Sequence, residues 1–172
     1  MKEFLLYPGC SMEYSARAYE KSLNAISGPL GMNLKEIDDW NCCGATEYLG
    51  ITVTPAYALI ARNLAIGARA ANGTRELVAP CSACYLNLAK VDNLMTEHED
   101  MNRQVNECLA AGGLKYKPGS VRVRHILDVI VSDIGGVVMP SARSSVLIAC
   151  ATATGVTAVA ASNVTPSFLS GS

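Results

Sequence analysis

The sequence predicts an α/β domain in which a small, largely parallel sheet is flanked by helices. Short apolar segments alternate with helical ones along most of the chain, as in parallel strands joined by crossover helices. The chain has 172 residues, half of them apolar, which is enough to bury the core of one ordinary domain. Five cysteines directly follow predicted strands, which places the cysteine loops at the carboxyl edge of the sheet.

Four strands and five helices are predicted. The strands are residues 3–7, 33–37, 76–79 and 121–124. The helices are residues 13–30, 54–71, 83–95, 102–111 and 125–133.

Turn residues mark the limits of the elements in the first half. Pro8-Gly9 closes the first apolar strand. Asp38-Asp39 is a turn signal after the second strand, and Pro55 lies in the first turn of the long alanine-rich helix. The first helix is expected to bury a stripe of residues at helical spacing, namely Tyr14, Ala18, Leu23 and Ile26.

Turn residues also mark the limits of the elements in the second half. Asn72-Gly73 stops the long helix before the third strand. Pro80 then leads into a helix that begins among cysteines, and Gly112-Gly113 ends the helix that comes next. His125 is expected to cap or pack at the start of the last helix.

Composition excludes several functions. The net charge is −1, so no basic excess exists to neutralise the phosphates of a nucleic acid. The apolar stretch 146–161 is too short to span a membrane and contains threonines. No export signal is recognisable at the start. We therefore expect a cytoplasmic protein that binds no nucleic acid and does not span a membrane.

The last forty residues differ from the rest. After Asp133 the only charged residue is Arg143. Residues 1–140 are expected to form the folded domain, and residues 141–172 a truncated or frameshifted segment that packs poorly.

The cysteines are the most informative residues. Their number, seven, is odd, which argues against a fully paired set of disulfides. Cys108 and Cys150 are interpreted as small buried hydrophobic residues. The other five lie in three loops that parallel strands bring to one edge, and they are Cys10, Cys42, Cys43, Cys81 and Cys84.

Five neighbouring thiols leave three chemical interpretations open. A single zinc ion takes four ligands, so a zinc site would leave one thiol free and five thiolates would carry a costly charge. An iron–sulfur cluster holds several irons and can use more ligands. The pair Cys81-x-x-Cys84 would also suit a thiol–disulfide enzyme, although three further cysteines make that less favourable.

Three blocks of the sequence resemble the CCG cysteine-rich motif. They are Tyr7-Pro8-Gly9-Cys10-Ser11, Trp40-Asn41-Cys42-Cys43-Gly44 and Pro80-Cys81-Ser82-Ala83-Cys84-Tyr85. The second block, and the segment from Val121 to Asp128, are similar to the family of B-type subunits of heterodisulfide reductase. The resemblance covers about residues 3–134.

The resemblance implies a cofactor, a reaction and partners. The five cysteines would hold a non-cubane [4Fe-4S] cluster, and the reaction would reduce a small mixed disulfide, that of coenzyme M and coenzyme B, to two thiols. Partners would be an iron–sulfur subunit of the C type and a flavin subunit of the A type. Catalytic residues beyond the cluster ligands are not expected.

The chain departs from that family in one respect. The family has two CCG halves, whereas this sequence carries one, and Ser145 to Cys150 resembles only the opening strand of a second. Two alternatives therefore stay open, a zinc-bound scaffold without catalysis and a CCG subunit of a lactate, glycolate or quinone-linked oxidoreductase.

Overall fold

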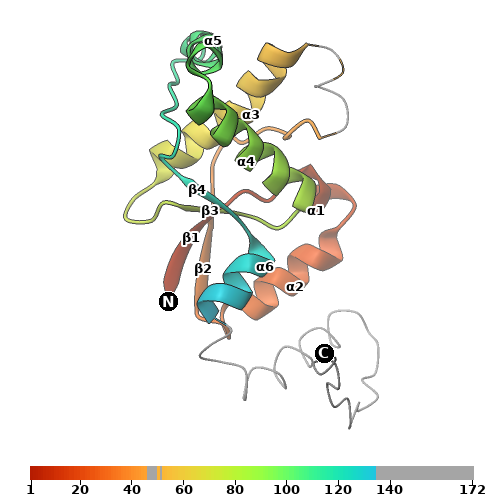
Figure 1. Ribbon diagram of the computed structural model, residues 1–172. Helices are drawn as coiled ribbons and strands as arrows, with labels where there is room; N and C mark the ends of the chain where they lie inside the picture. Colours follow the sequence, from red (N-terminus) through yellow and green to blue (C-terminus); the bar gives the residue numbers. More distant parts are fainter. Residues whose placement is uncertain (46–49, 51, 135–172) are drawn as a thin grey trace, which may run out of the picture.

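The computed structural model describes residues 1–45, 50 and 52–134. Within these residues the fold is α/β, with a four-stranded, all-parallel sheet in the order β2-β1-β3-β4 and helices on both faces (Figure 1). The predicted fold class is confirmed.

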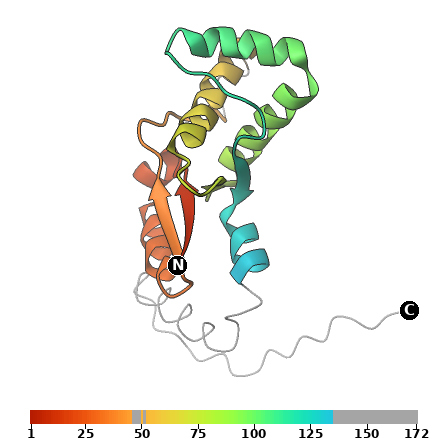
Figure 2. The ribbon, with the colours of Figure 1, turned by 90° about the vertical axis from the view of Figure 1, so that its left-hand side faces the viewer.

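Each strand lies within one residue of its predicted range. The strands are β1 (Lys2–Leu6), β2 (Met32–Glu36), β3 (Glu76–Ala79) and β4 (Arg122–His125). In the central strand Leu5 pairs with Lys35 of β2 and with Leu77 of β3. Figure 2 shows β1 and β2 side by side, with β4 at the opposite edge of the sheet.

Side-chain alternation in the strands builds a layer of helices on each face. Leu5 and Leu77 pack in a core with the first layer, whereas Phe4 and Val78 point into a second core on the opposite face. The first layer contains α3 (Val53–Ala70), α4 (Ser82–Glu97) and α5 (Glu99–Ala110). The second contains α1 (Cys10–Tyr14), α2 (Arg17–Ser27) and α6 (Ile126–Val129), which continues into the π-helix η2 (Ile130–Ile134).

The predicted helix 13–30 is two helices. Gly9, at a φ of 77°, turns the chain so that α1 begins earlier, at Cys10. Ala16 then leaves the helical region, and the Ser11 carbonyl accepts from the backbone N–H groups of both Ser15 and Ala16. The predicted stripe is therefore wrong in its first half, because the break rotates Tyr14 to 81% exposure.

The break also explains the rest of that stripe. Ala18 is exposed, Leu23 is buried as predicted, and Ile26 is half-buried. Met12 takes the buried place in α1, so the second core is filled by a residue that regular helical spacing did not select.

The predicted helix 125–133 is also modified, because it changes from α to π after four residues. His125 begins it as expected of a cap, with Nδ1 accepting from the backbone N–H of Leu127 at 3.2 Å. The π turn carries Asp133, whose carboxylate lies 2.9 Å from Nη1 of the buried Arg124.

Two expectations concern the rest of the chain. Among the helices of the described part, none is long and apolar enough to cross a membrane. The expected boundary at residue 140, the segment 141–172 and Cys150 lie outside the described residues.

Candidate cysteine-rich metal centre

The five predicted site cysteines lie together at the carboxyl edge of the sheet. Cys10 follows β1, Cys42 and Cys43 follow β2, and Cys81 and Cys84 follow β3. These three strands are neighbours in the sheet. Parallel topology thus brings together cysteines that are far apart in sequence, as the strand pattern predicts.

Within the edge, four of the sulfurs form two pairs. The Sγ atoms of Cys10 and Cys42 lie 3.6 Å apart at the surface. Those of Cys43 and Cys84 lie 3.4 Å apart and are buried. Half-buried Cys81 precedes Cys84 by one turn, at the start of α4. The site therefore has an open outer pair and a shielded inner pair.

Two glycines allow the loops to approach the sulfurs closely. A Cβ on Gly9 would lie 2.8 Å from Cys84 Sγ, which is closer than the atoms can pack. Gly44 has a φ of 65°, and its N–H donates to Cys42 Sγ at 3.4 Å. Both glycines occupy conformations that disfavour other residues.

Buried amides hold the loop that carries Cys42 and Cys43. Asn63 is fully buried on α3, and its side chain accepts from the N–H of Asn41 and donates to the Asn41 carbonyl, both at 2.9 Å. Asn87 on α4 donates to the Cys43 carbonyl at 3.0 Å. The hydroxyl of Tyr7 adds a bond to the Asn41 carbonyl at 2.8 Å.

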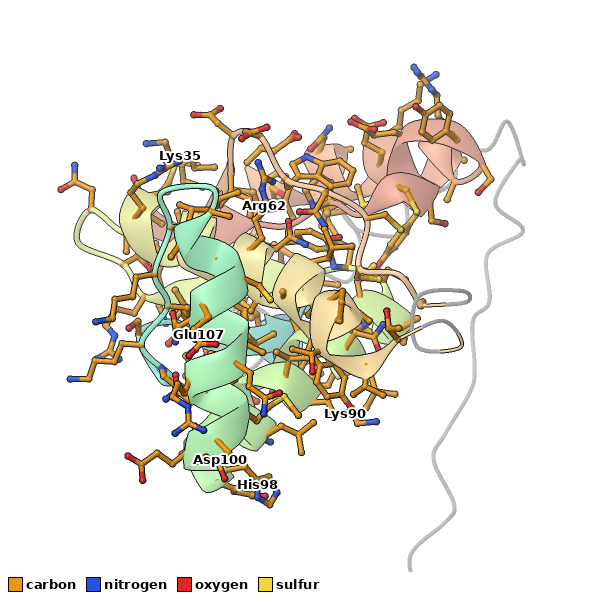
Figure 3. All side chains as sticks on the ribbon, turned by 90° about the horizontal axis from the view of Figure 1, so that it is seen from above. Lys35, Arg62, Lys90, His98, Asp100 and Glu107 are labelled. Carbon is orange, nitrogen blue, oxygen red and sulfur yellow. The ribbon has the colours of Figure 1, made fainter. Side chains whose placement is uncertain are left out.

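Arg62 braces the same loop from outside. Its guanidinium donates to the Asp39 carbonyl and carboxylate, both at 2.6 Å, and to the Asn41 side chain. Figure 3 labels Arg62, which lies on α3, in a view from above. Trp40 is fixed between an edge-on contact with Tyr7 and a hydrogen bond to Glu36. The sequence pattern indicates only a surface cation at Arg62, so this role was missed.

Hydrogen bonds and burial shift the pKa values of the two inner thiols in opposite directions. The bond shared with Cys84, assisted by the backbone N–H of Ala45 and the side chain of Asn87, lowers the pKa of Cys43 to about 6. The same shared bond, together with burial, raises the pKa of the Cys84 thiol. One thiolate is therefore favoured at neutral pH, with its neighbour keeping a proton.

The site also raises the pKa values of Tyr7 and Cys10. Burial, and then the charges of Cys84, Cys43, Cys42 and Cys10, raise the pKa of Tyr7. Its hydroxyl thus stays protonated and able to donate. At the outer pair, hydrogen bonding to Cys42 raises the pKa of Cys10, which keeps that proton between the two sulfurs.

An open groove of about 590 Å³ lies beside the outer pair. Both outer sulfur residues line it, together with the aromatic residues Tyr14 and Trp40. Four acidic residues also line it, namely Glu13, Glu36, Asp38 and Asp39. A small molecule can therefore reach the outer pair through a polar, acidic entrance.

The remaining predicted residues lie away from the sulfur pairs or play supporting roles. His125 Nε2 lies 3.3 Å from the hydroxyl of Ser82, a residue between the two cysteines at the start of α4. The His125 ring also contacts the Tyr85 ring edge-on. Cys108 is exposed on α5, so its interpretation as a buried thiol is wrong. The helical period there places it on the outer face, beside buried Leu109.

The donor set suits a soft, thiolate-bound metal group. Five thiols converge from three loops, and thiolates are the ligands of zinc and of iron–sulfur clusters. In the described residues no three His, Cys, Asp or Glu side chains already surround a single point as a metal ion would require. The sulfurs instead lie in two close pairs, Cys10 with Cys42 and Cys43 with Cys84.

Comparison with known proteins agrees with this chemistry. The family described as "CCG: Cysteine-rich domain" matches residues 4–89, which is half of the chain and contains all five site cysteines. An 8-methylmenaquinol:fumarate reductase membrane anchor subunit of Wolinella succinogenes is 32% identical over 133 residues. That alignment covers 77% of this chain and 45% of the relative.

More distant relatives come from heterodisulfide reductases. A protein of Archaeoglobus profundus that is described as similar to the B-type subunit of heterodisulfide reductase is 29% identical. The B-type subunit of a CoB–CoM heterodisulfide reductase of Methanosarcina acetivorans is 25% identical. Each alignment covers 78% of this chain and 44% of the relative. The chain thus spans less than half the length of the curated relatives it matches.

A solved structure shares the fold. A hypothetical protein from Helicobacter pylori matches with a TM-score of 0.64 at 19% identity, over 76% of this chain and 25% of that one. At this identity the likeness shows the fold alone.

Proposed function

Because this chain belongs to the family of CCG cysteine-rich domains, we propose that it is an iron–sulfur subunit of a disulfide-reducing oxidoreductase. Cys10, Cys42, Cys43, Cys81 and Cys84 would hold a non-cubane [4Fe-4S] cluster. The observation that carries the proposal is the convergence of these five thiols at one edge, in two sulfur pairs 3.4 and 3.6 Å apart.

The chain's own residues would prepare and protect that site. Asn63 and Asn87 fix the backbone at Asn41 and Cys43, and N–H groups near the sulfurs stabilise thiolates. The buried inner pair excludes water, while the groove beside Cys10 and Cys42 admits a small disulfide. The bound cluster would supply single electrons for splitting the disulfide into two thiols.

The disulfide of coenzyme M and coenzyme B is the proposed substrate. The B-type subunit of a CoB–CoM heterodisulfide reductase is related to this chain at 25% identity, and the Trp40–Gly44 block supports the same branch. Because the alignments cover only 44–45% of those relatives, a second cysteine-rich half would be needed for the complete reaction. Subunits of the C and A types would deliver the electrons, and six free thiols in the described residues favour a cytoplasmic setting.

A second candidate is a subunit of a quinol-linked reductase. It is favoured by the fumarate reductase anchor subunit, which is 32% identical to this chain. In that case the same cysteines would pass electrons between a quinol-oxidising partner and a catalytic partner, and the groove would have no disulfide to bind. A zinc-bound scaffold is the third possibility that the thiols allow.

Electron paramagnetic resonance of the anaerobically purified, iron-loaded chain tests the proposal. Adding a thiol to the oxidised sample is expected to produce a new thiol-dependent signal. Cys84→Ser should lose bound iron and the signal, whereas Cys108→Ser, at an exposed cysteine outside the site, should keep both. If the iron-loaded chain gives a resonance signal that does not change when thiol is added, the result would contradict disulfide chemistry and favour the quinol-linked role.

A further inference from the structure

The two sulfur pairs differ in their access to solvent. Cys10 is exposed, Cys42 is half-buried, and both line the groove. Cys43 and Cys84 are 2% and 3% exposed. Small oxidants can therefore reach the outer pair, while the inner pair is shielded by the protein around it.

The outer sulfurs are also close enough to bond. Their separation of 3.6 Å exceeds a disulfide bond, about 2.05 Å, by a distance that rotation about side-chain torsions can close. Cys10 and Cys42 belong to loops that follow adjacent strands. Their approach therefore requires no rearrangement of the sheet.

We propose that Cys10 and Cys42 form a reversible disulfide in the metal-free chain, by exchange with a small disulfide molecule that enters through the groove. The backbone N–H of Gly44 donates to Cys42 Sγ at 3.4 Å and holds that sulfur at the wall of the groove. Cys42 is therefore the attacking residue, and exposed Cys10 is the resolving one.

The exchange takes two balanced steps. Cys42 attacks one sulfur of the small disulfide, whose S–S bond breaks and releases a first thiol. Cys10 then attacks Cys42 Sγ, which forms the Cys10–Cys42 bond, breaks the mixed disulfide and releases a second thiol. Two electrons pass from the protein to the small disulfide, and the protons of the two cysteines end on the two released thiols.

The groove indicates which small disulfide makes the best probe. Its volume of about 590 Å³ suits a compact molecule, and its carboxylates attract cations. Cystamine, a small disulfide with two amines, meets both conditions.

The disulfide would control loading of the site. It removes two of the five thiols from metal binding, so iron could be inserted only after a reductant has reopened the bond. This consequence rests on the function proposed above, whereas the disulfide itself does not.

Peptide mapping of the full-length, metal-free chain tests the disulfide. The reduced chain is treated with cystamine, its residual thiols are blocked with iodoacetamide, and it is digested without reduction. A Cys10–Cys42 cross-link is expected. Cys10→Ser should instead keep one cysteamine on Cys42, because the resolving thiol is missing. Cys108→Ser should retain the cross-link.

Two results would overturn the proposal. One is iodoacetamide modification of both Cys10 and Cys42 after cystamine treatment. The other is a Cys43–Cys84 cross-link that forms before the outer one, because it would show that burial does not shield the inner pair.

Iron uptake tests the consequence separately. Cystamine-treated chain should take up at least about tenfold less iron than reduced chain, because loss of outer-shell partners alone costs about 10–100-fold in metal affinity and the disulfide removes two ligands. Dithiothreitol should restore uptake. Equal uptake with the cross-link present would refute control of loading. Failure of the reduced chain to bind iron would count against the proposed function, and the peptide map would still decide the disulfide.

Discussion

At the scale of single residues, the site depends on small and amide side chains as much as on cysteines. Gly9 leaves room for Cys84 Sγ, and Asn63 fixes the backbone next to Cys42. Neither residue has metal-binding chemistry of its own. Their roles follow from how three loops share one edge, which sequence spacing alone does not reveal.

Replacing Gly9 by alanine should remove metal binding. The new Cβ would lie 2.8 Å from Cys84 Sγ, and the backbone conformation of Gly9, with φ 77° and ψ 150°, adds about 1–3 kcal/mol of strain for any other residue. Gly31→Ala is the matched control, because Gly31 has a φ of 70° with nothing within 4 Å of its Cβ position. Iron per chain and the free energy of unfolding should both fall for Gly9→Ala, but only the latter for Gly31→Ala. Equal iron in both variants would contradict the close approach.

Replacing Asn63 by alanine should weaken both stability and metal binding. It removes two hydrogen bonds and leaves buried backbone groups of the cysteine loop with fewer partners, which costs about 2 kcal/mol. Asn106 makes the same two hydrogen bonds to the backbone of Tyr116, away from the five site cysteines. Asn106→Ala should therefore lower the denaturation midpoint without lowering bound iron. Loss of iron in both variants would mean that general destabilisation is the cause.

At the scale of elements, an ion-pair network joins parts of the sheet that lie far apart in sequence. Arg124 of β4 is 4% exposed and binds Glu76 of β3, Asp128 of α6 and Asp133 of η2. Lys2 of β1 binds Asp133 at 2.6 Å. A buried arginine must keep such partners, so the network fixes the last helical turns against the sheet.

This network should make stability depend on acid pH. The hydrogen bonds from Lys2 and Arg124 lower the pKa of Asp133, whereas an unfolded aspartate titrates near about 3.9. The contribution is therefore complete above that value and is lost as the pH falls through the lower folded pKa. Denaturant unfolding from pH 6 downward should show this loss, and Asp133→Asn should lack that part of it. Asp100→Asn, at an exposed pair with Arg103, should keep the wild-type dependence of the unfolding free energy on pH. A weaker pH dependence in Asp100→Asn would argue against the network.

Most elements were predictable from local sequence, and the exceptions have local causes. Turn residues limit the strands, so all four appear within one residue of their predicted ranges. The break between α1 and α2 was not predictable, because Ser15 and Ala16 carry no helix-breaking signal. It lies where Ala16 leaves the helical region and the Ser11 carbonyl accepts from two backbone N–H groups.

At the scale of the whole molecule, topology explains how three short cysteine blocks that lie far apart in sequence form one site. Three separate loops meet because β1, β2 and β3 are parallel neighbours, and this convergence was predictable from the order of strands and helices. The division into an open and a shielded sulfur pair was not, because it depends on how α1, α3 and α4 pack around the loops. The exposure of Cys108 was not predictable for a similar reason, because it depends on which face of α5 packs against the core.

The central claim is that the five cysteines bind an iron–sulfur cluster. The most direct measurement is the content of iron, acid-labile sulfide and zinc per chain after anaerobic purification. We predict about four irons with matching sulfide and little zinc. One zinc per chain without iron would contradict the cluster and identify the site as a zinc-bound scaffold.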